Sequence, residues 1–181
     1  MPDITHRAYD LLQTVTSGSP FRTEDVSQLL LDTIPVHEGW VSWNQRLLTL
    51  LPAPREIPSP RGDPLYPLVY LYDDPWRGSS HIIVASCMLI TNLVFSITEY
   101  GGDRSKEVRH LVDRICKSVE TVSKGTCGPS RVAVGLRISY EAGGAETREW
   151  IKGWLREFEG RYAATNYQSY PKTTAVELLP S

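Results

Sequence analysis

The stretch that decides the expected fold is residues 103–140, DRSKEVRHLVDRICKSVETVSKGTCGPSRVAVGLRISY. From Asp103 to Val122, apolar residues recur at helical spacing and predict an amphipathic helix whose stripe is Val108, Leu111, Val112, Ile115, Val119 and Val122. From Arg131 to Tyr140, apolar residues alternate with polar or small ones, which predicts a half-buried strand. A helix followed by a strand with one apolar face is typical of an α+β domain.

The flanking segments extend this pattern on both sides. Residues 145–162 predict a second amphipathic helix, and Leu68–Tyr72 predicts a strand that ends at the turn Asp73-Asp74-Pro75. Residues 78–98 contain no Asp, Glu, Lys or Arg, but their many Ser, Thr and Asn residues argue against a membrane span. Because this stretch is rich in β-branched and alternating residues, one long buried strand or two are expected over residues 81–100.

The first third of the chain predicts two short helices and a loop. Thr23 is expected to cap a helix that Pro35 stops, and Ser42 with Gln45 resembles a capping box for a second helix. Residues 4–16 fit a helix or a strand equally well. Six prolines between residues 52 and 67 predict an exposed loop, since proline suits neither a helix interior nor a central strand.

We therefore expect a single α+β domain over residues 1–164. Its core would be an antiparallel or mixed sheet of about four to five strands covered by amphipathic helices. The Pro-rich surface loop 52–67 would lie on its outside, and residues 165–181 would form a tail or a docked arm. The strand order cannot be read from these patterns.

Composition argues against a catalytic or metal centre. The 181 residues carry a net charge of −2 and only three cysteines, without C-x-x-C spacing, and the four histidines lack an H-x-x-x-H arrangement. No metal, cofactor or catalytic residue is therefore expected, and we interpret the chain as a non-enzymatic protein. Cys127, in a Gly-rich loop, is the one candidate exposed thiol, and a turn cysteine is the favoured interpretation.

Charge and aromatic residues indicate surfaces for contact with other molecules. An acidic N-terminal region and a basic region, Arg104, Arg109, Arg114 and Lys117, predict head-to-tail self-association, or contact with an anionic membrane or a nucleoprotein. No specific DNA sequence and no membrane-spanning segment are expected as partners. Trp40, Trp43 and Trp76 lie in or near expected loops, where tryptophans often mark interfaces. A loose adaptor motif is formed by Tyr66, Pro67 and Leu71.

Two short stretches carry a family resemblance. Ser19-Pro20-Phe21-Arg22-Thr23 followed by Asp25-Val26, and Asn92–Tyr100 further on, resemble the first core helix and a late strand of rhabdovirus matrix proteins. The resemblance implies a self-associating protein that links an inner membrane face to a nucleocapsid during assembly and budding, in the cytoplasm, at that membrane and in the virion. The chain departs from the family at its N-terminus, which is acidic where the family is basic.

Two other functions remain open from the sequence. One is a small intracellular enzyme or ligand-binding domain with a pocket between the sheet and the C-terminal helix. The other is an accessory protein that binds a host factor through the Pro-rich loop.

Overall fold

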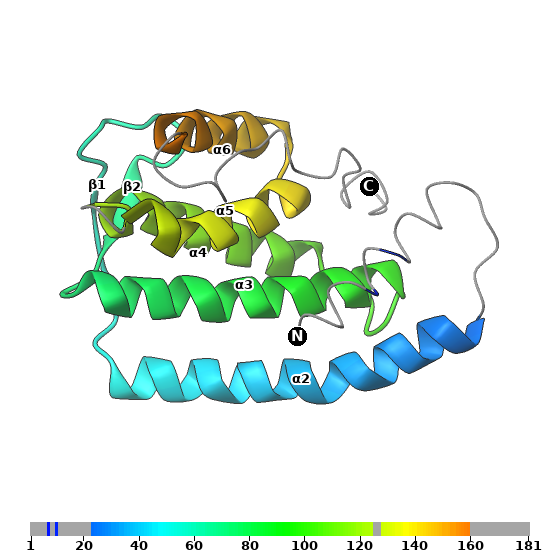
Figure 1. Ribbon diagram of the computed structural model, residues 1–181. Helices are drawn as coiled ribbons and strands as arrows, with labels where there is room; N and C mark the ends of the chain where they lie inside the picture. The colour runs from blue at the N-terminus through cyan, green and yellow to red at the C-terminus, as the bar shows by residue number, and fades with distance from the viewer. Residues whose placement is uncertain (1–6, 8–9, 11–22, 125–127, 160–181) are drawn as a thin grey trace.

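The chain is predominantly helical in the computed structural model, which describes Arg7, Asp10, residues 23–124 and residues 128–159. The described elements are α2 (Thr23–Leu50), β1 (Arg55–Pro58), β2 (Leu68–Leu71), α3 (Pro75–Ile97), α4 (Ser105–Val122), α5 (Gly128–Ala142) and α6 (Ala145–Phe158). Helix α2 lies at one side of the molecule and α6 at the other, with α3, α4 and α5 between them (Figure 1). The expected sheet of four to five strands is wrong, because the sheet in this part of the chain has two strands.

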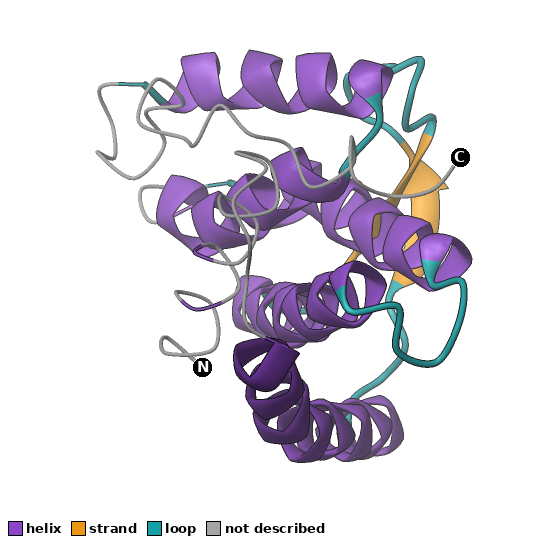
Figure 2. Ribbon diagram, turned by 90° about the vertical axis from the view of Figure 1, so that its right-hand side faces the viewer, coloured by secondary structure: helices purple, strands orange, loops and turns teal. Residues whose placement is uncertain are grey.

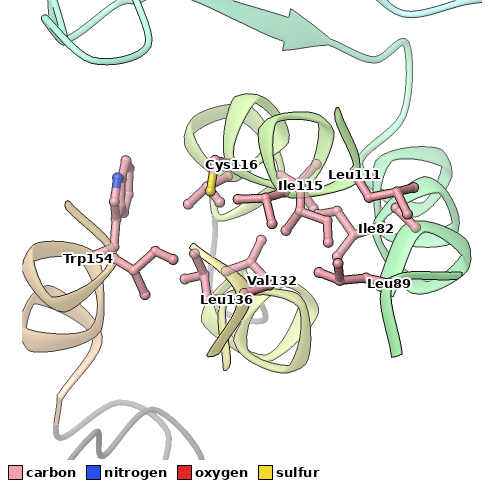
Figure 3. Close-up of a cluster of buried hydrophobic side chains, with 14 of the residues drawn as sticks. Ile82, Leu89, Leu111, Ile115, Cys116, Val132, Leu136 and Trp154 are labelled. Atoms are coloured by element: carbon pink, nitrogen blue, oxygen red, sulfur yellow. The ribbon is translucent and has the colours of Figure 1, made fainter. Parts of the chain in front are cut away.

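Helix α4 is the centre of the fold and confirms the helix expected after Asp103. All six residues of its apolar stripe are buried. Their side chains meet those of α3, α5 and α6 in one core, part of which is drawn in Figure 3. The stripe therefore packs on other helices, whereas the sequence predicted that it would cover a sheet.

The strand expected at residues 131–140 is wrong, because these residues belong to helix α5. Val134, expected to face the core, is exposed, while Ser139 is buried. Gly135 explains the error. A Cβ atom there would lie 2.5 Å from Cγ2 of Ile82 and 3.0 Å from Cγ2 of Ile115. The small residues thus mark the side on which α5 approaches α3 and α4 closely, and their alternation with apolar residues only imitates a strand.

The strands expected over residues 81–100 are also replaced by a helix, α3. Asp74 caps it by accepting a hydrogen bond from the Trp76 amide at 2.8 Å, and Pro75 follows at the first helical position. Its hydroxyl groups bond back to carbonyls one turn earlier, as Ser86 does to Ile82 at 2.7 Å and Ser96 to Asn92 at 2.9 Å. Because these bonds satisfy the side chains locally, polar residues can occupy a helix that is buried on most sides.

Among the described residues, α3 is also the one helix long and apolar enough to cross a membrane, on length and composition alone. Of the apolar window concerned, 61% is buried inside the protein. The central helix of a packed core passes the same test, so α3 is weak evidence for a span.

Helix α2 merges the two short helices expected at its ends. Pro35 lies inside it and Ser42 lies in its interior, so neither the expected stop nor the expected capping box is present. Proline removes the hydrogen bond that the carbonyl of Leu31 would accept. Leu31 is exposed. Water can therefore reach the side of the helix on which that bond is missing, which allows the helix to continue.

The Pro-rich segment 52–67 contains strand β1, which pairs antiparallel with β2 from Arg55 opposite Leu71 to Pro58 opposite Leu68. The strand expected at Leu68–Tyr72 is thereby confirmed, and Figure 2 shows the two strands beside the helices. The rest of the segment is tied to the helices. The Ser59 hydroxyl donates to Oε2 of Glu120 at 2.7 Å, and the Trp150 indole donates to Oδ2 of Asp63 at 2.5 Å.

Helix α6 confirms the last expected helix as far as Phe158, with Ile151, Trp154, Leu155 and Phe158 buried. Several expectations fall outside the described residues: the thiol of Cys127, the tail 165–181 and, apart from Arg7 and Asp10, the segment 4–16.

Candidate functional site

Arg114, one of the four residues of the expected basic patch, lies in a polar cluster between α2, α3 and α4. Its Nη1 donates to Oδ1 of Asn44 at 2.9 Å, and its Nη2 lies 2.8 Å from Nδ1 of His81. Tyr72 joins the cluster, with its hydroxyl 2.8 Å from Oγ of Ser118, which itself donates to the carbonyl of Arg114. Arg114 is only partly exposed. The guanidinium is thus held in place from both sides by neutral groups.

Burial sets the protonation of this cluster. It lowers the pKa of His81 to about 4, and the neighbouring Arg114 charge acts in the same direction. His81 is therefore neutral at pH 7, and because its Nδ1 accepts from Arg114, its proton lies on Nε2. That Nε2 is buried and has no partner within the described part of the chain. Burial also lowers the pKa of Arg114 and raises that of Tyr72.

The other three residues of the expected basic patch each have a partner of their own. Arg104 donates to Oε2 of Glu107 at 3.0 Å, with its guanidinium carbon 5.2 Å from the Phe95 ring centre. Lys117 forms an ion pair with Glu56 at 2.8 Å. Arg109 remains exposed, and its Nε donates to a backbone carbonyl. Arg104, Arg114 and Lys117 are thus engaged within the chain, and the patch as a whole is not a free cationic surface.

The three tryptophans singled out from the sequence have different surroundings. Trp40 is partly buried and packs against the main core, whereas Trp43 is exposed on α2. Trp76 is 67% exposed in the first turn of α3. The guanidinium carbon of Arg131, from α5, lies 4.8 Å from the centre of its ring. Only Trp76 therefore combines exposure with a cation from another helix.

Two further exposed apolar side chains lie near this pair. Ile83 follows Trp76 by two helical turns, which places both on the same side of α3, and it is 52% exposed. Val134 follows Arg131 by one turn on α5 and is 59% exposed. The two helices lie side by side, as the closeness of Gly135 to Ile82 requires (Figure 1). We call these four residues, Trp76, Ile83, Arg131 and Val134, the α3–α5 face.

The tyrosine of the expected adaptor motif is buried against the C-terminal helix. Tyr66 is buried, and its ring lies 4.7 Å from that of Trp150 in an edge-to-face contact. Pro67 is exposed, and Leu71 belongs to β2. A partner could not read the tyrosine of this motif without undocking the loop. The sheet against which the sequence placed a ligand pocket is not present among the described residues.

Within the described part of the chain, the remaining titratable and thiol groups do not converge on one site. Cys116 is fully buried in α4, and burial raises its pKa to about 12. Glu141, in the last turn of α5, is buried, and its pKa is raised to about 7. No group of three His, Cys, Asp or Glu side chains within residues 23–124 and 128–159 could hold a metal ion. Asp73 forms an ion pair with Arg77, and Asp74 caps α3.

Sequence reasoning missed the partners of Arg114 and the burial of Glu141. Asn44 and His81 lie 70 and 33 residues from Arg114. No local spacing connects them. One signal was available, because Arg114 directly precedes Ile115 of the apolar stripe and follows Leu111 by three residues. A residue at that position lies beside the buried face of its helix.

Comparison with known proteins gives no relative: no family model, no curated protein and no solved structure matches this chain. The resemblance to rhabdovirus matrix proteins thus stays a hypothesis from short motifs. One of its elements changes, because Asn92–Ile97, expected in a late strand, ends helix α3. Of the other motif, Thr23, Asp25 and Val26 lie at the start of α2, and its first four residues are outside the described part.

Proposed function

We propose that this chain is a non-enzymatic structural protein that self-associates, and that copies of it meet through the α3–α5 face. The observation that carries the proposal is the exposed Trp76 ring with the Arg131 guanidinium 4.8 Å from its centre. Tryptophan and arginine are the side chains most enriched in the central, energetically dominant part of protein interfaces. Ile83 and Val134 add exposed apolar surface to the same face.

The contact proposed here is chiefly apolar, whereas the sequence suggested a contact between charged regions. Arg104, Arg114 and Lys117 are engaged within the chain, so they offer little charge to a neighbouring copy. An apolar contact changes with salt in the opposite sense from an ionic one. Sulfate strengthens the burial of apolar surface, while screening weakens pairs of exposed charges.

The arrangement of titratable groups supports a non-enzymatic role. His81 lies near the beginning of α3 and Glu141 in the last turn of α5, at opposite ends of two helices that run side by side (Figure 1). Both side chains are buried. Groups with displaced pKa values that serve a reaction normally share a cleft. The cluster of His81 with Arg114 and Tyr72 has displaced pKa values but no carboxylate among its described partners, and Glu141 lies at the other end of the helix pair.

Sedimentation velocity of the full chain over a range of concentrations tests the proposal. The wild-type protein should form larger species as its concentration rises, and sodium sulfate should favour them. The double variant Ile83→Asp with Val134→Asp should associate at least about tenfold more weakly, which corresponds to about 1.4 kcal/mol. Leu48→Asp is the matched control, since Leu48 is also exposed but lies on α2.

Two results would contradict self-association through this face. One is a wild-type chain that stays monomeric at every concentration, and the other is a double variant that associates like the control. Flotation with phosphatidylserine vesicles completes the design. A monomeric wild type that floats, and loses this property on Trp76→Ala, would show that the face binds lipid and that the proposed contact between copies is wrong.

A further inference from the structure

The Arg114 cluster contains a positive charge that nothing in its surroundings balances. The two acceptors that hold the guanidinium, Oδ1 of Asn44 and Nδ1 of His81, are both neutral. The hydroxyls of Tyr72 and Tyr70 are the groups whose charge interactions favour the charged form. The carboxylate of Glu56, in β1, is bound to Lys117, which lies on the next turn of α4. Arg114 is therefore a partly buried cation without a carboxylate partner among the described residues.

A partly buried cation without an anionic partner is unfavourable for the stability of a protein. Taking a cation partly out of water is unfavourable unless an anion or solvent compensates its charge, and arginine is a side chain that proteins commonly use to bind phosphate. His81 increases the imbalance, because its buried Nε2–H is a further donor without an acceptor in the described structure. The cluster thus offers unused N–H groups of Arg114 and has no carboxylate among its described partners, which is the composition of a site for an anion.

We propose that the Arg114 guanidinium, positioned by Asn44 and His81, binds an oxyanion of the phosphate class. The N–H groups of Arg114 not used by Asn44 and His81 can grip two oxygens of one phosphate, as the planar fork of arginine does elsewhere. Lys117 lies one turn further along α4, with its Nζ 5.5 Å from the centre of the Tyr70 ring. Arg114 also interacts with Tyr70. Lys117 is paired with Glu56, so the planar fork of Arg114, and not a second free cation, is what suits the site to a phosphate.

The first test uses inorganic phosphate and the full chain at pH 7. Binding followed by nuclear magnetic resonance should saturate in the millimolar range and shift the signals of the His81 ring and the Asn44 amide. Arg114→Gln should weaken binding at least tenfold. Arg109→Gln is the matched control, because it removes one charge from an exposed position of the same helix. Equal losses in both variants would show that phosphate senses only the net charge and would overturn the proposal, as would the absence of saturable binding by the wild type.

A second variant keeps the test decisive if Arg114→Gln does not fold. Asn44→Ala retains the charge of Arg114 but removes one of the two groups that position it, so phosphate affinity should fall while net charge is unchanged. Unaltered affinity would contradict the assigned site.

Vesicles distinguish the two sources of a phosphate group. Binding of the wild type to vesicles that contain phosphatidic acid, lost in Arg114→Gln but not in Arg109→Gln, identifies a lipid headgroup. Binding of inorganic phosphate alone identifies a free phosphate. Both results support the site, and neither depends on self-association through the α3–α5 face.

Discussion

Helices α2 and α4 are attached to the molecule in different ways. Helix α4 has 18 residues, of which ten are buried, whereas α2 has 28 residues, of which Leu29, Thr33 and Leu47 are buried. Polar contacts supplement this small apolar contact of α2: Nδ1 of His37 lies 2.8 Å from Oγ1 of Thr91, and Asn44 accepts from Arg114. Helix α4 is therefore held by the burial of apolar side chains, and α2 largely by a few hydrogen bonds. Substitutions and pH should affect the two helices unequally.

The largest effect is expected from a cavity beside α4. Ile115 is fully buried in the main core. Ile115→Ala should lower the free energy of unfolding by about 2–5 kcal/mol, because it removes buried methyl groups and leaves a void. Urea denaturation measures this loss. The control, Leu48→Ala on the exposed side of α2, should stay within about 0.5 kcal/mol of the wild type. A negligible loss for Ile115→Ala would contradict the central position of α4.

The next largest effect concerns the close approach of α5. Gly135→Val should cost about 1–3 kcal/mol, at the upper end of that range, since its Cβ would meet Ile82 and Ile115. Gly153→Ala in α6 is the matched control, because a Cβ there meets nothing within 4 Å. That control should stabilise the protein by about 0.4–1 kcal/mol. Thermal unfolding of both variants measures the contrast, and a stabilising Gly135→Val would refute the packing of α5 described here.

The dependence of the free energy of unfolding on pH should show opposite contributions from His81 and Glu141. The pKa of His81 is lowered from 6.5 to about 4, so between these values the unfolded chain binds a proton that the folded chain does not. Stability should therefore be retained above pH 6.5 and lost as the pH falls towards 4, at most by about 1.4 kcal/mol per pH unit from this group. Burial also lowers the pKa of His37, which acts in the same sense.

Glu141 acts in the opposite direction. Its pKa is raised from 4.5 to about 7, so its contribution is present below pH 4.5 and is lost as the pH rises through 7. Urea denaturation at several pH values tests both. His81→Asn should reduce the loss on the acid side, and Glu141→Gln should reduce the loss towards neutral pH. Identical pH profiles for the wild type and both variants would show that neither group is displaced as described.

The smallest effect should come from the polar attachment of α2. Asn44→Ala removes one acceptor of Arg114 and should cost about 0.5–1.5 kcal/mol, because the partly exposed guanidinium can recover a bond to water. Gln45→Ala, at an exposed neighbouring position, should leave the free energy of unfolding unchanged. A loss as large as that of Ile115→Ala would mean that α2 is fixed as firmly as α4 and would remove the contrast between the two helices.

The sequence predicted helices where one face is charged and the other apolar. Helices α4 and α6 meet that condition, so their stripes were identified with the correct residues. Helices α3 and α5 lie between other helices, and their buried sides carry small residues such as Ser86 and Gly135. Small residues are buried there together with large apolar ones such as Leu89 and Leu136, so a search for alternating polarity finds strands that do not exist.

The sequence indicated single candidate residues but not which of them lie together on one surface. Trp76 is exposed, as a residue expected in a turn can be, and its place at an interface stays a prediction. The sequence could not show that Arg114 is partly buried, because its partners come from α2 and α3 through tertiary packing. A count of charges along one helix cannot separate a solvated arginine from one held between three helices.

The attachment of the Pro-rich segment has a consequence for folding kinetics. Arg61 forms two hydrogen bonds with Glu157, at 2.6 and 2.8 Å, across 96 residues, and its guanidinium lies 4.0 Å from the centre of the Trp154 ring. Consecutive helices from α3 to α6 are joined by short connections and pack on each other, which is fast, whereas a contact over 96 residues requires the closure of a long loop. The hairpin should therefore dock after the helices have assembled. Arg61→Ala should then mainly accelerate unfolding and leave the folding rate nearly unchanged, as expected for a contact absent from the transition state.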